Sequence, residues 1–373
     1  MQIAFVIASL RAGGAERVAS LLCNEWAESN KVSLITFDGA QHDFYRLDPK
    51  INRFELGFFK TSSHFLVKLG QNIKRLYRFR SAIKAIKPDL ILSFMDVPNG
   101  ISLLGSMFTG IPVVISERVD PHFPGYGFAV EKIKKALYRW AAACVCQTQV
   151  VAAWAREFLP KAKVWVIPNP IQIKGFSDLD IRKPKESIIL AIGRLEQQKG
   201  FERLISAFHA VSGKFPDWDL IILGEGSERA SLSNQVEKLG LLNRVYLPGL
   251  IPEYEISDFF RKAACFALSS RAEGFPNALL EAMAHGLAVV SFDCPSGPAE
   301  IILSGVNGFL VPDGDVTQFS EALTKLMNSG ELRRQLGSQA RLVREKYQLD
   351  KISDKWLTVF REILDQRAAH GYG

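Results

Sequence analysis

The sequence predicts an α/β protein of two domains, each with a mainly parallel β-sheet covered by helices on both faces. Short apolar, β-branched runs alternate with amphipathic helical stretches, which is the pattern of such a sheet. The pattern occurs twice, and 373 residues are too many for one ordinary core but suit two α/β domains. Two prolines within three residues, Pro168 and Pro170, indicate the boundary between the two domains. The predicted domains are residues 1–170 and 171–350.

Each predicted element follows from a local change in hydrophobic period. In the first half, strands are expected at 2–8, 31–37, 89–94, 111–116, 143–147 and 163–167, with helices near 15–28, 70–86, 128–140 and 149–158. In the second half, strands are expected near 187–192, 218–223, 244–247, 264–268, 287–292 and 308–311, with helices between them.

The composition is that of a globular protein, with 47% hydrophobic and 23% charged residues. The first residues lack a basic leader and are expected to form a strand, not a signal peptide. No run of apolar residues is long enough for a membrane-spanning helix, so a soluble or peripheral protein is expected. The five cysteines have no paired metal-ligand spacing, which favours free thiols in a reducing cytoplasm.

The net charge of +7 is unevenly distributed. Residues 1–173 hold 22 Lys+Arg and 13 Asp+Glu, or +9, whereas residues 174–373 hold 24 and 26, or −2. Two basic helices, Lys68–Lys87 and Glu131–Trp140, carry part of this excess. Each fits a core-packed helix with a solvated basic face, and together they also fit an anionic membrane surface. Nucleic acid is disfavoured because no nucleic-acid-binding motif is present.

The most specific stretch runs from Cys265 to Ala282. It reads as a buried strand, a polar loop over Ser269–Phe275, and a helix over Pro276–His285, with Pro276 at the first helical position. In an open α/β sheet such a turn lies at the carboxyl end of a strand, where helix amides bind phosphate groups. The sequence therefore places the reacting centre at this turn.

Two carboxylates flank the turn, Glu273 before the helix and Glu281 within it. Glu281 has apolar neighbours all round the helix, and a buried carboxylate needs a partner. Either the hydroxyls of a sugar or a basic side chain in the core would be a suitable partner for Glu281. Glu273, considered alone, fits a solvated loop residue.

Further turns with functional potential follow other predicted strands. Gly13 and Gly14 follow the first strand, where they permit a tight turn and a close approach of the backbone to a ligand. Their spacing disfavours a nicotinamide dinucleotide site, and a purely structural turn is the alternative to ligand binding. In Gly193-Arg194-Leu195-Glu196-Gln197-Gln198-Lys199-Gly200, the two basic side chains can converge on one dianion. Two basic residues near a turn are otherwise usually solvated.

The motifs E-G-F-P-N-A-L-L-E and G-R-L-x-x-x-K-G resemble those of family 4 of the retaining glycosyltransferases. The resemblance implies the GT-B fold, in which two Rossmann-like domains face each other across a cleft. It implies that Glu281 holds the ribose of the nucleotide, that Glu273 and the following amides hold the transferred sugar, and that the helix start faces the diphosphate. It also implies that the last segment, residues 351–373, crosses back to the first domain.

The same resemblance assigns the remaining donor-side groups. Arg194 and Lys199 would hold the diphosphate and stabilise the leaving nucleotide, so that no metal or cofactor is needed and the nucleotide sugar is a co-substrate. With Glu273 they form the expected catalytic set. The expected donor-binding residues are Gly13, Gly14, Gly193, Arg194, Lys199, Gly224, Leu250, Ile251, Glu273, Gly274, Phe275, Pro276, Asn277, Leu280 and Glu281.

Asp96, Glu117 and Arg118 end two predicted strands of the first domain, and we assign them to the acceptor side. The family often has a histidine near the position of Arg118, so a histidine-based role is not carried over. The alternative is that Glu117 and Arg118 pair with neighbouring side chains in the core or at the surface.

The resulting interpretation is a cytoplasmic enzyme that transfers a sugar from a nucleotide-diphosphate sugar, UDP favoured, to a glycan acceptor with retention at the anomeric carbon. The acceptor is expected to be lipid-linked. The basic first domain would bind the inner face of the membrane, and nucleic acid is not an expected partner. A nucleotide-sugar 2-epimerase of similar fold and a non-catalytic carbohydrate-binding protein are the alternatives.

Overall fold

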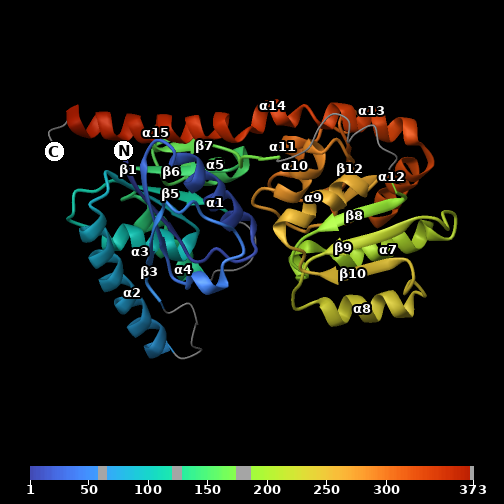
Figure 1. The fold of residues 1–373 in the computed structure, drawn as a ribbon, viewed down its shortest axis with the longest axis horizontal. Coiled ribbons are helices and arrows are strands. Elements are labelled where there is room, and N and C mark those ends of the chain that lie inside the picture. The colour runs from blue at the N-terminus through green and yellow to red at the C-terminus, as the bar shows by residue number, and fades with distance from the viewer. Residues whose placement is uncertain (58–64, 120–127, 174–185, 370–373) are drawn as a thin grey trace. The chain divides into compact units, whose positions relative to one another are not determined.

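The computed structural model describes residues 1–57, 65–119, 128–173 and 186–369 (Figure 1). It divides the chain into two compact units, the first formed by Met1–Pro170 with Gln348–Gly373, and the second by Ile171–Tyr347. The first unit is therefore discontinuous in sequence, with its last segment returning after the second unit is complete.

The first unit contains a seven-stranded parallel sheet in the order β3-β2-β1-β4-β5-β6-β7. The strands are β1 (Gln2–Ile7), β2 (Lys31–Thr36), β3 (Asn52–Glu55), β4 (Leu90–Phe94), β5 (Val113–Glu117), β6 (Ala143–Cys146) and β7 (Val164–Val166). The helices are α1 (Gly14–Trp26), α2 (Phe65–Ile86), α3 (Asp96–Gly105), α4 (Phe128–Tyr138), α5 (Gln149–Arg156) and α15 (Leu349–Ala369), with short 3-10 turns at Ala40–His42 and Lys161–Lys163.

The strands of this sheet are buried on both faces, as a parallel sheet requires. Alternate residues of β1 face opposite cores: Ile3 and Phe5 pack with α1 and α15, whereas Ala4 and Val6 pack with α2 to α5. We call these the α1 face and the α3 face of the sheet. The last helix, α15, is tied into the α1 face because Trp26 Nε1 donates a hydrogen bond to Ser353 Oγ at 2.9 Å.

Two elements of the first unit were not predicted. The strand β3 is short, lies at the sheet edge and has no fully buried residue, and its sequence N-R-F-E lacks an apolar signal. The helix α3 begins D-V-P-N-G, which is typical of a turn. Pro98 is nevertheless compatible with a helix there because it lies in the first turn, where no intrahelical N–H bond is required.

The second unit contains a six-stranded parallel sheet in the order β10-β9-β8-β11-β12-β13. The strands are β8 (Ile188–Ile192), β9 (Asp219–Leu223), β10 (Val245–Gly249), β11 (Cys265–Leu268), β12 (Ala288–Asp293) and β13 (Phe309–Pro312). The helices are α7 (Phe201–Ser212), α8 (Arg229–Lys238), α9 (Glu253–Lys262), α10 (Asn277–Ala284), α11 (Pro298–Ile301), α12 (Val316–Asn328), α13 (Gly330–Ala340) and α14 (Val343–Tyr347), with a 3-10 turn at Gln197–Lys199.

Helices cover both faces of this sheet as well. One core contains α7, α8 and α12, and the other contains α9, α10 and α14. Each unit is thus a Rossmann-like α/β layer structure, as the alternating pattern predicts. The five cysteines are buried and free. In the part of the chain that the structure describes, no helix is both long and apolar enough to cross a bilayer.

Candidate functional site

The predicted donor site lies at the carboxyl ends of three adjacent strands in the second unit. Because β9, β8 and β11 are neighbours in the sheet, the turns that follow them lie side by side. Gly193, after β8, donates its N–H to Leu223 O at 3.0 Å, and Gly224, after β9, donates to Gly249 O at 2.9 Å. The glycine turns expected at this edge are therefore in direct backbone contact.

The structure joins two of the three predicted catalytic side chains. Lys199 Nζ lies 2.7 Å from Glu273 Oε1, and these side chains are only 18% and 6% exposed. Ser270 donates its hydroxyl proton to the same carboxylate oxygen at 2.6 Å. This places one cation and one carboxylate, 74 residues apart in sequence, at a single point of the sheet edge.

Backbone contacts hold the two loops that carry this pair. Ser269 Oγ donates to Lys199 O at 2.9 Å, and Gln198 Nε2 donates to Ala272 O at 2.8 Å. Gly200 has φ +60°, and a Cβ there would lie 2.3 Å from Ser269 O. Only glycine permits this approach, because other residues would collide with backbone atoms.

Arg194 belongs to the same turn but extends toward solvent. Its side chain is 57% exposed, and a guanidinium nitrogen lies 3.0 Å from Glu196 Oε1. No described contact joins Arg194 to Lys199 or Glu273. The Arg194 guanidinium is therefore accessible to an anion, which would compete with Glu196 for it.

The helix α10 differs at its start from the expectation. Pro276 precedes the helix as its N-cap, with ψ 78°, and the first helical residue is Asn277. The dihedral shows that the chain is still turning at Pro276, so the prediction of a helix start there was wrong by one residue. Gly274 and Phe275 complete the turn, and Phe275 packs into the core beneath it.

Glu281 is buried in α10, with a residue exposure of 7% among apolar neighbours. This agrees with the apolar pattern around it. Leu280 is 0% exposed and belongs to the core, so its side chain supports the helix and does not line a ligand surface, unlike the expectation. At the end of β10, Leu250 is 52% exposed, while Ile251 packs partly against the same core.

A loop that was not assigned to the site also contacts it. After β12, Ser296 and Gly297 both have positive φ, at 65° and 118°. A Cβ at Gly297 would lie 2.6 Å from Pro276 Cδ, and Glu273 N donates to Pro295 O at 3.4 Å. The strained loop therefore braces the turn that carries Glu273.

We expect Gly224→Ala to abolish nucleotide binding and lower the melting temperature. Gly224 has φ +144°, and an added Cβ would lie 1.9 Å from Gly193 O, so the turns must separate. The control is Gly213→Ala at the end of α7, where φ is −66° and nothing lies within 4 Å of the new Cβ. Thermal unfolding and nucleotide titration of both variants check this; unchanged nucleotide affinity in Gly224→Ala would contradict it.

In the first unit, Asp96 and Glu117 meet at the carboxyl ends of β4 and β5. Lys134 of α4 bridges them, with Nζ 2.5 Å from Asp96 Oδ1 and 2.7 Å from Glu117 Oε2. The side chain of Lys134 is only 11% exposed. The expectation that α4 presents its lysines to an anionic surface is therefore wrong for Lys134, which neutralises buried carboxylates instead.

Two neutral residues complete this cluster. The hydroxyl of Tyr138 lies 3.1 Å from Glu117 Oε2 and accepts a hydrogen bond from Asn99 Nδ2 at 3.1 Å. Burial raises the pKa of Glu117 to about 7, Lys134 opposes that rise, and the charge of Asp96 adds to it. We call Asp96, Asn99, Glu117, Lys134 and Tyr138 the acidic cluster. Sequence reasoning missed Lys134 and Tyr138, because the helical pattern does not reveal which polar face meets the sheet edge.

Arg118 follows Glu117 but lies on the opposite, α1 face of the sheet. Its guanidinium carbon is 4.0 Å from the centroid of the Phe94 ring, and a guanidinium nitrogen donates to Asn169 Oδ1 at 2.7 Å. The residue is 7% exposed. Glu117 and Arg118 thus do not pair with each other, because successive strand residues point to opposite faces.

The glycines that follow β1 differ in backbone conformation from the expectation. Gly13 is the N-cap of α1 in an extended conformation, with φ −171°. Neither Gly13 nor Gly14 has a positive φ, so no tight turn requires glycine there. The expectation of a tight glycine turn was therefore wrong, although both residues do lie at the carboxyl end of a strand.

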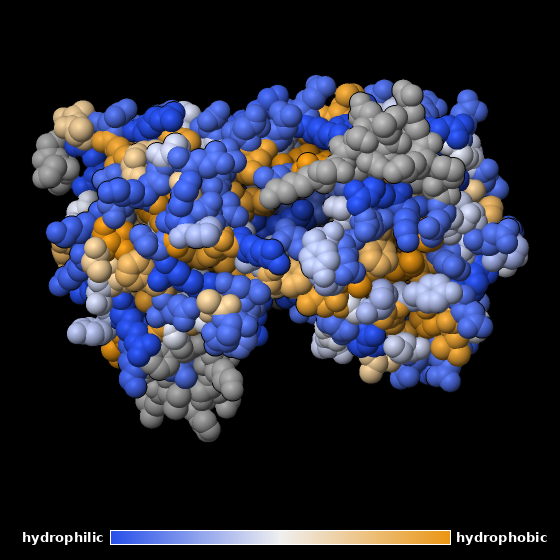
Figure 2. Space-filling view, in the orientation of Figure 1, coloured by the Kyte–Doolittle hydropathy of each residue, from blue (hydrophilic) through white to orange (hydrophobic). Residues whose placement is uncertain are grey.

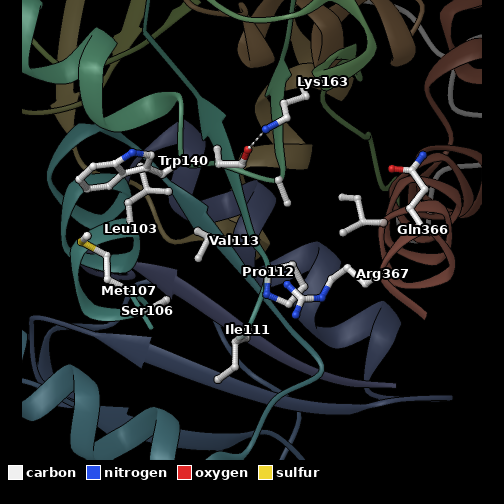
Figure 3. Close-up of a pocket in the computed structure, with 13 residues that line it drawn as sticks. Leu103, Ser106, Met107, Ile111, Pro112, Val113, Trp140, Lys163, Gln366 and Arg367 are labelled. Carbon is white, nitrogen blue, oxygen red and sulfur yellow. Dashed lines mark hydrogen bonds between the residues drawn. The ribbon is translucent and has the colours of Figure 1, made fainter. Parts of the chain in front are cut away.

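A cavity of about 400 Å³ lies in the first unit at the amino end of β5 (Figure 3). Val113, the first residue of β5, lines it together with Trp140 and Arg367, and Lys163 Nζ donates to Ala141 O at 3.1 Å. Its lining contains no carboxylate. Over the described ranges, no group of three or more His, Cys, Asp or Glu side chains is arranged to hold a metal ion.

Two family models match almost the whole chain. Residues 12–174 match the model described as Glycosyltransferase Family 4, and residues 178–343 match the model described as Glycosyl transferases group 1. Together with two Rossmann-like units, these matches define a glycosyltransferase of GT-B fold. The chain belongs to glycosyltransferase family 4, and it is a hexosyltransferase.

Individual proteins agree with this assignment over their full length. A glycosyltransferase of Haemophilus influenzae is 28% identical over 364 residues, covering 95% of this chain and 98% of that protein. A Campylobacter jejuni enzyme is 26% identical over 368 residues, covering 97% and 99%. It is named GalNAc-alpha-(1->4)-GalNAc-alpha-(1->3)-diNAcBac-PP-undecaprenol alpha-1,4-N-acetyl-D-galactosaminyltransferase. The crystal structure of Anabaena HepE in complex with UDP superposes with a TM-score of 0.80 at 21% identity, covering 97% of this chain and 100% of HepE.

Proposed function

We propose that this enzyme transfers a hexose from a UDP-sugar to a glycan acceptor carried on a membrane lipid, with retention at the anomeric carbon, in bacterial surface glycan synthesis. The observation that carries the proposal is the Lys199–Glu273 pair beside the helix α10. Support for the substrates comes from the Campylobacter relative, named for a diphospho-undecaprenol acceptor and an α-1,4 linkage, and from the UDP bound to HepE. An α product from an α-configured donor means retention.

The roles of the donor-side residues follow from their charges. Lys199 and Arg194 provide the positive charge that stabilises the diphosphate as it leaves, and the amides before α10 add partial positive charge. Glu273 accepts hydrogen bonds from the hydroxyls of the transferred sugar, and Glu281 from those of the ribose. The leaving diphosphate takes the proton of the attacking hydroxyl. No metal ion takes part in this scheme, so EDTA should leave the rate unchanged.

Asp96, with Glu117 behind it, is the acceptor-side group in this proposal. Asp96 is the more exposed carboxylate of the acidic cluster, at 18% against 1% for Glu117. A sugar hydroxyl can therefore donate to Asp96 while Glu117 and Lys134 fix its position. Carboxylates are suited to this role because they accept hydrogen bonds and donate none.

The test is a turnover assay that combines UDP- and GDP-sugars with a prenyl-diphosphate-linked glycan. We expect acceptor-dependent release of UDP and an α-linked product, identified by the anomeric proton coupling in NMR. Appearance of an epimerised nucleotide sugar without acceptor would identify a 2-epimerase. Binding of sugars without turnover of any nucleotide sugar would indicate a carbohydrate-binding protein.

We expect Glu281→Gln to reduce kcat/KM for the donor by about 10²-fold while the protein stays folded. The amide is nearly isosteric, but it removes the charge that strengthens hydrogen bonds from ribose hydroxyls. The matched control is Glu300→Gln, in the short helix α11. Nucleotide titration and thermal unfolding of both variants check this, and full transferase activity in Glu281→Gln would refute the assignment.

Binding to an anionic membrane surface is the remaining part of the proposal. On α2, Ile73 and Tyr77 are 60% and 76% exposed and lie one turn apart. On α4, Val130 and Ile133 are also exposed. The face drawn in Figure 2 is mainly hydrophilic with hydrophobic residues interspersed. Apolar side chains among basic ones favour an interfacial contact.

Flotation with vesicles tests the membrane contact directly. We expect the protein to float with vesicles that contain anionic phospholipid at low salt, and to be released at high salt because screening weakens the attraction. Equal binding to zwitterionic vesicles would mean that charge is not responsible. Absence of binding to either vesicle would remove the membrane from the proposal without affecting the transferase activity.

A further inference from the structure

Arg118 is a buried cation that forms no ion pair with any residue that the structure describes. Its contacts are to neutral groups: Asn169 Oδ1 at 2.7 Å, Ser116 Oγ at 3.5 Å and the face of the Phe94 ring at 4.0 Å. Its Nε is buried without a hydrogen-bond partner. Among the described residues, no carboxylate lies within ion-pair distance of it.

This arrangement is unfavourable in the protein alone. Removing a guanidinium from water is opposed by several kcal/mol unless an anion compensates it. Burial lowers the pKa of Arg118 to about 9, and the charge of Glu16, in the first turn of α1, only partly opposes that effect. Arg118 is still charged at neutral pH, so the fold keeps a buried and only partly compensated positive charge at the carboxyl end of β5.

The neighbours of Arg118 do not depend on it. Asn169 Oδ1 also accepts a hydrogen bond from Gln147 Nε2 at 2.7 Å, and Ser116 Oγ donates to Val145 O at 2.9 Å. Both polar groups would remain hydrogen-bonded if the guanidinium were absent. A purely structural role, in which Arg118 satisfies buried acceptors, therefore does not account for the residue.

We propose that Arg118 is the centre of an anion subsite in the first unit that binds a phosphoryl group of a substrate. The contact with the face of the Phe94 ring holds the guanidinium in place, and a guanidinium can bind two phosphate oxygens at once. This inference rests on the proposed function for its ligands, a nucleotide diphosphate and a prenyl diphosphate.

The test compares Arg118→Met with two other arginine variants. Arg194→Met removes the exposed cation of the donor turn. Arg53→Met is the structural control, because Arg53 is half-buried in the same unit and ion-paired with Asp43. Binding of inorganic pyrophosphate, UDP and a short-chain prenyl diphosphate to each variant is measured by calorimetry, and melting temperature is measured without ligand.

We expect Arg118→Met to lose at least tenfold in affinity for one of the three probes, with a melting temperature equal to or above that of the wild type. If the affinity for UDP falls, Arg118 binds a phosphoryl group of the donor. If the affinity for the prenyl diphosphate falls, it binds a phosphoryl group of the acceptor. A fall in the affinity for pyrophosphate alone would establish the anion subsite. Arg53→Met should melt lower and bind all probes normally. Unchanged binding of all three probes to a folded Arg118→Met, or a lower melting temperature in that variant with unchanged binding, would overturn the proposal.

The outcome is separable from that of the proposed function. If no sugar transfer is found but pyrophosphate binding depends on Arg118, the transferase substrates are wrong and the subsite stands. If transfer proceeds normally in Arg118→Met and every probe binds as in the wild type, the subsite is wrong and the proposed function stands.

Discussion

Replacing Lys199 with Met is expected to reduce kcat by about 10³-fold and to destabilise the second unit by about 2 kcal/mol. The loss of rate follows because a cation is removed from the place where the diphosphate develops charge. The loss of stability follows because the Glu273 carboxylate, 6% exposed, keeps only the hydroxyl of Ser270 in place of its ion-pair partner. Steady-state kinetics and urea unfolding measure the two effects.

The double variant Lys199→Met with Glu273→Gln separates the two effects. Removing both charges eliminates the unpaired carboxylate, so stability should return to within about 1 kcal/mol of the wild type. Activity should not return, because neither the cation nor the sugar-binding carboxylate is restored. If activity recovered together with stability, Lys199 would have a structural role only.

The second large effect is expected for Lys134→Met in the acidic cluster. This change leaves Asp96 and the almost fully buried Glu117 without their cation, and breaking such a pair costs about 3–5 kcal/mol. Transfer to the acceptor should fall with it, because Asp96 loses its position. The matched control is Lys135→Met, the next residue of α4, whose Nζ lies 3.0 Å from Glu131 on the surface; that change should have little effect.

The pH dependence distinguishes this cluster from ordinary packing. The pKa of Glu117 is raised from 4.5 to about 7. Between these two pH values the folded state therefore binds more protons than the unfolded state. The contribution of Glu117 to stability therefore falls as the pH rises toward 7. Without Lys134 the pKa of Glu117 should rise further, so that stability continues to fall above pH 7.

Urea unfolding across the pH range therefore provides the check. Lys134→Met should lose most stability at alkaline pH, and Lys134→Met with Glu117→Gln should lose that pH dependence. An equal loss of stability at all pH values in the single variant would mean that Lys134 contributes by packing only.

The strands and the donor motifs could be predicted from sequence because each is a local signal. Apolar runs locate the strands within a few residues, and parallel strands bring their carboxyl ends to one edge, which is why Lys199 and Glu273 were expected together. Pro276 was misplaced by one residue because proline fixes φ but leaves ψ free, and ψ decides whether a helix has begun.

The acidic cluster was harder to predict because its cation comes from a different element. Lys134 lies among the basic residues of α4, and the amphipathic pattern alone assigns all of them to solvent. Its burial depends on how α4 docks over β4 and β5, which is a tertiary property. That Arg118 has no ion-pair partner among the described residues likewise emerges only when the neighbouring strands are in place.

The way the chain leaves and re-enters the first unit has a consequence for protein engineering. The second unit is one uninterrupted segment, and its two ends are joined by a hydrogen bond of 2.8 Å from Ile171 N to Tyr347 O. That segment can be exchanged between homologues as a single cassette with two closely spaced junctions. The first unit has no such freedom: a chimera that ends before α15 would expose Trp26 and its aromatic neighbours, so any graft must retain the native carboxyl-terminal helix.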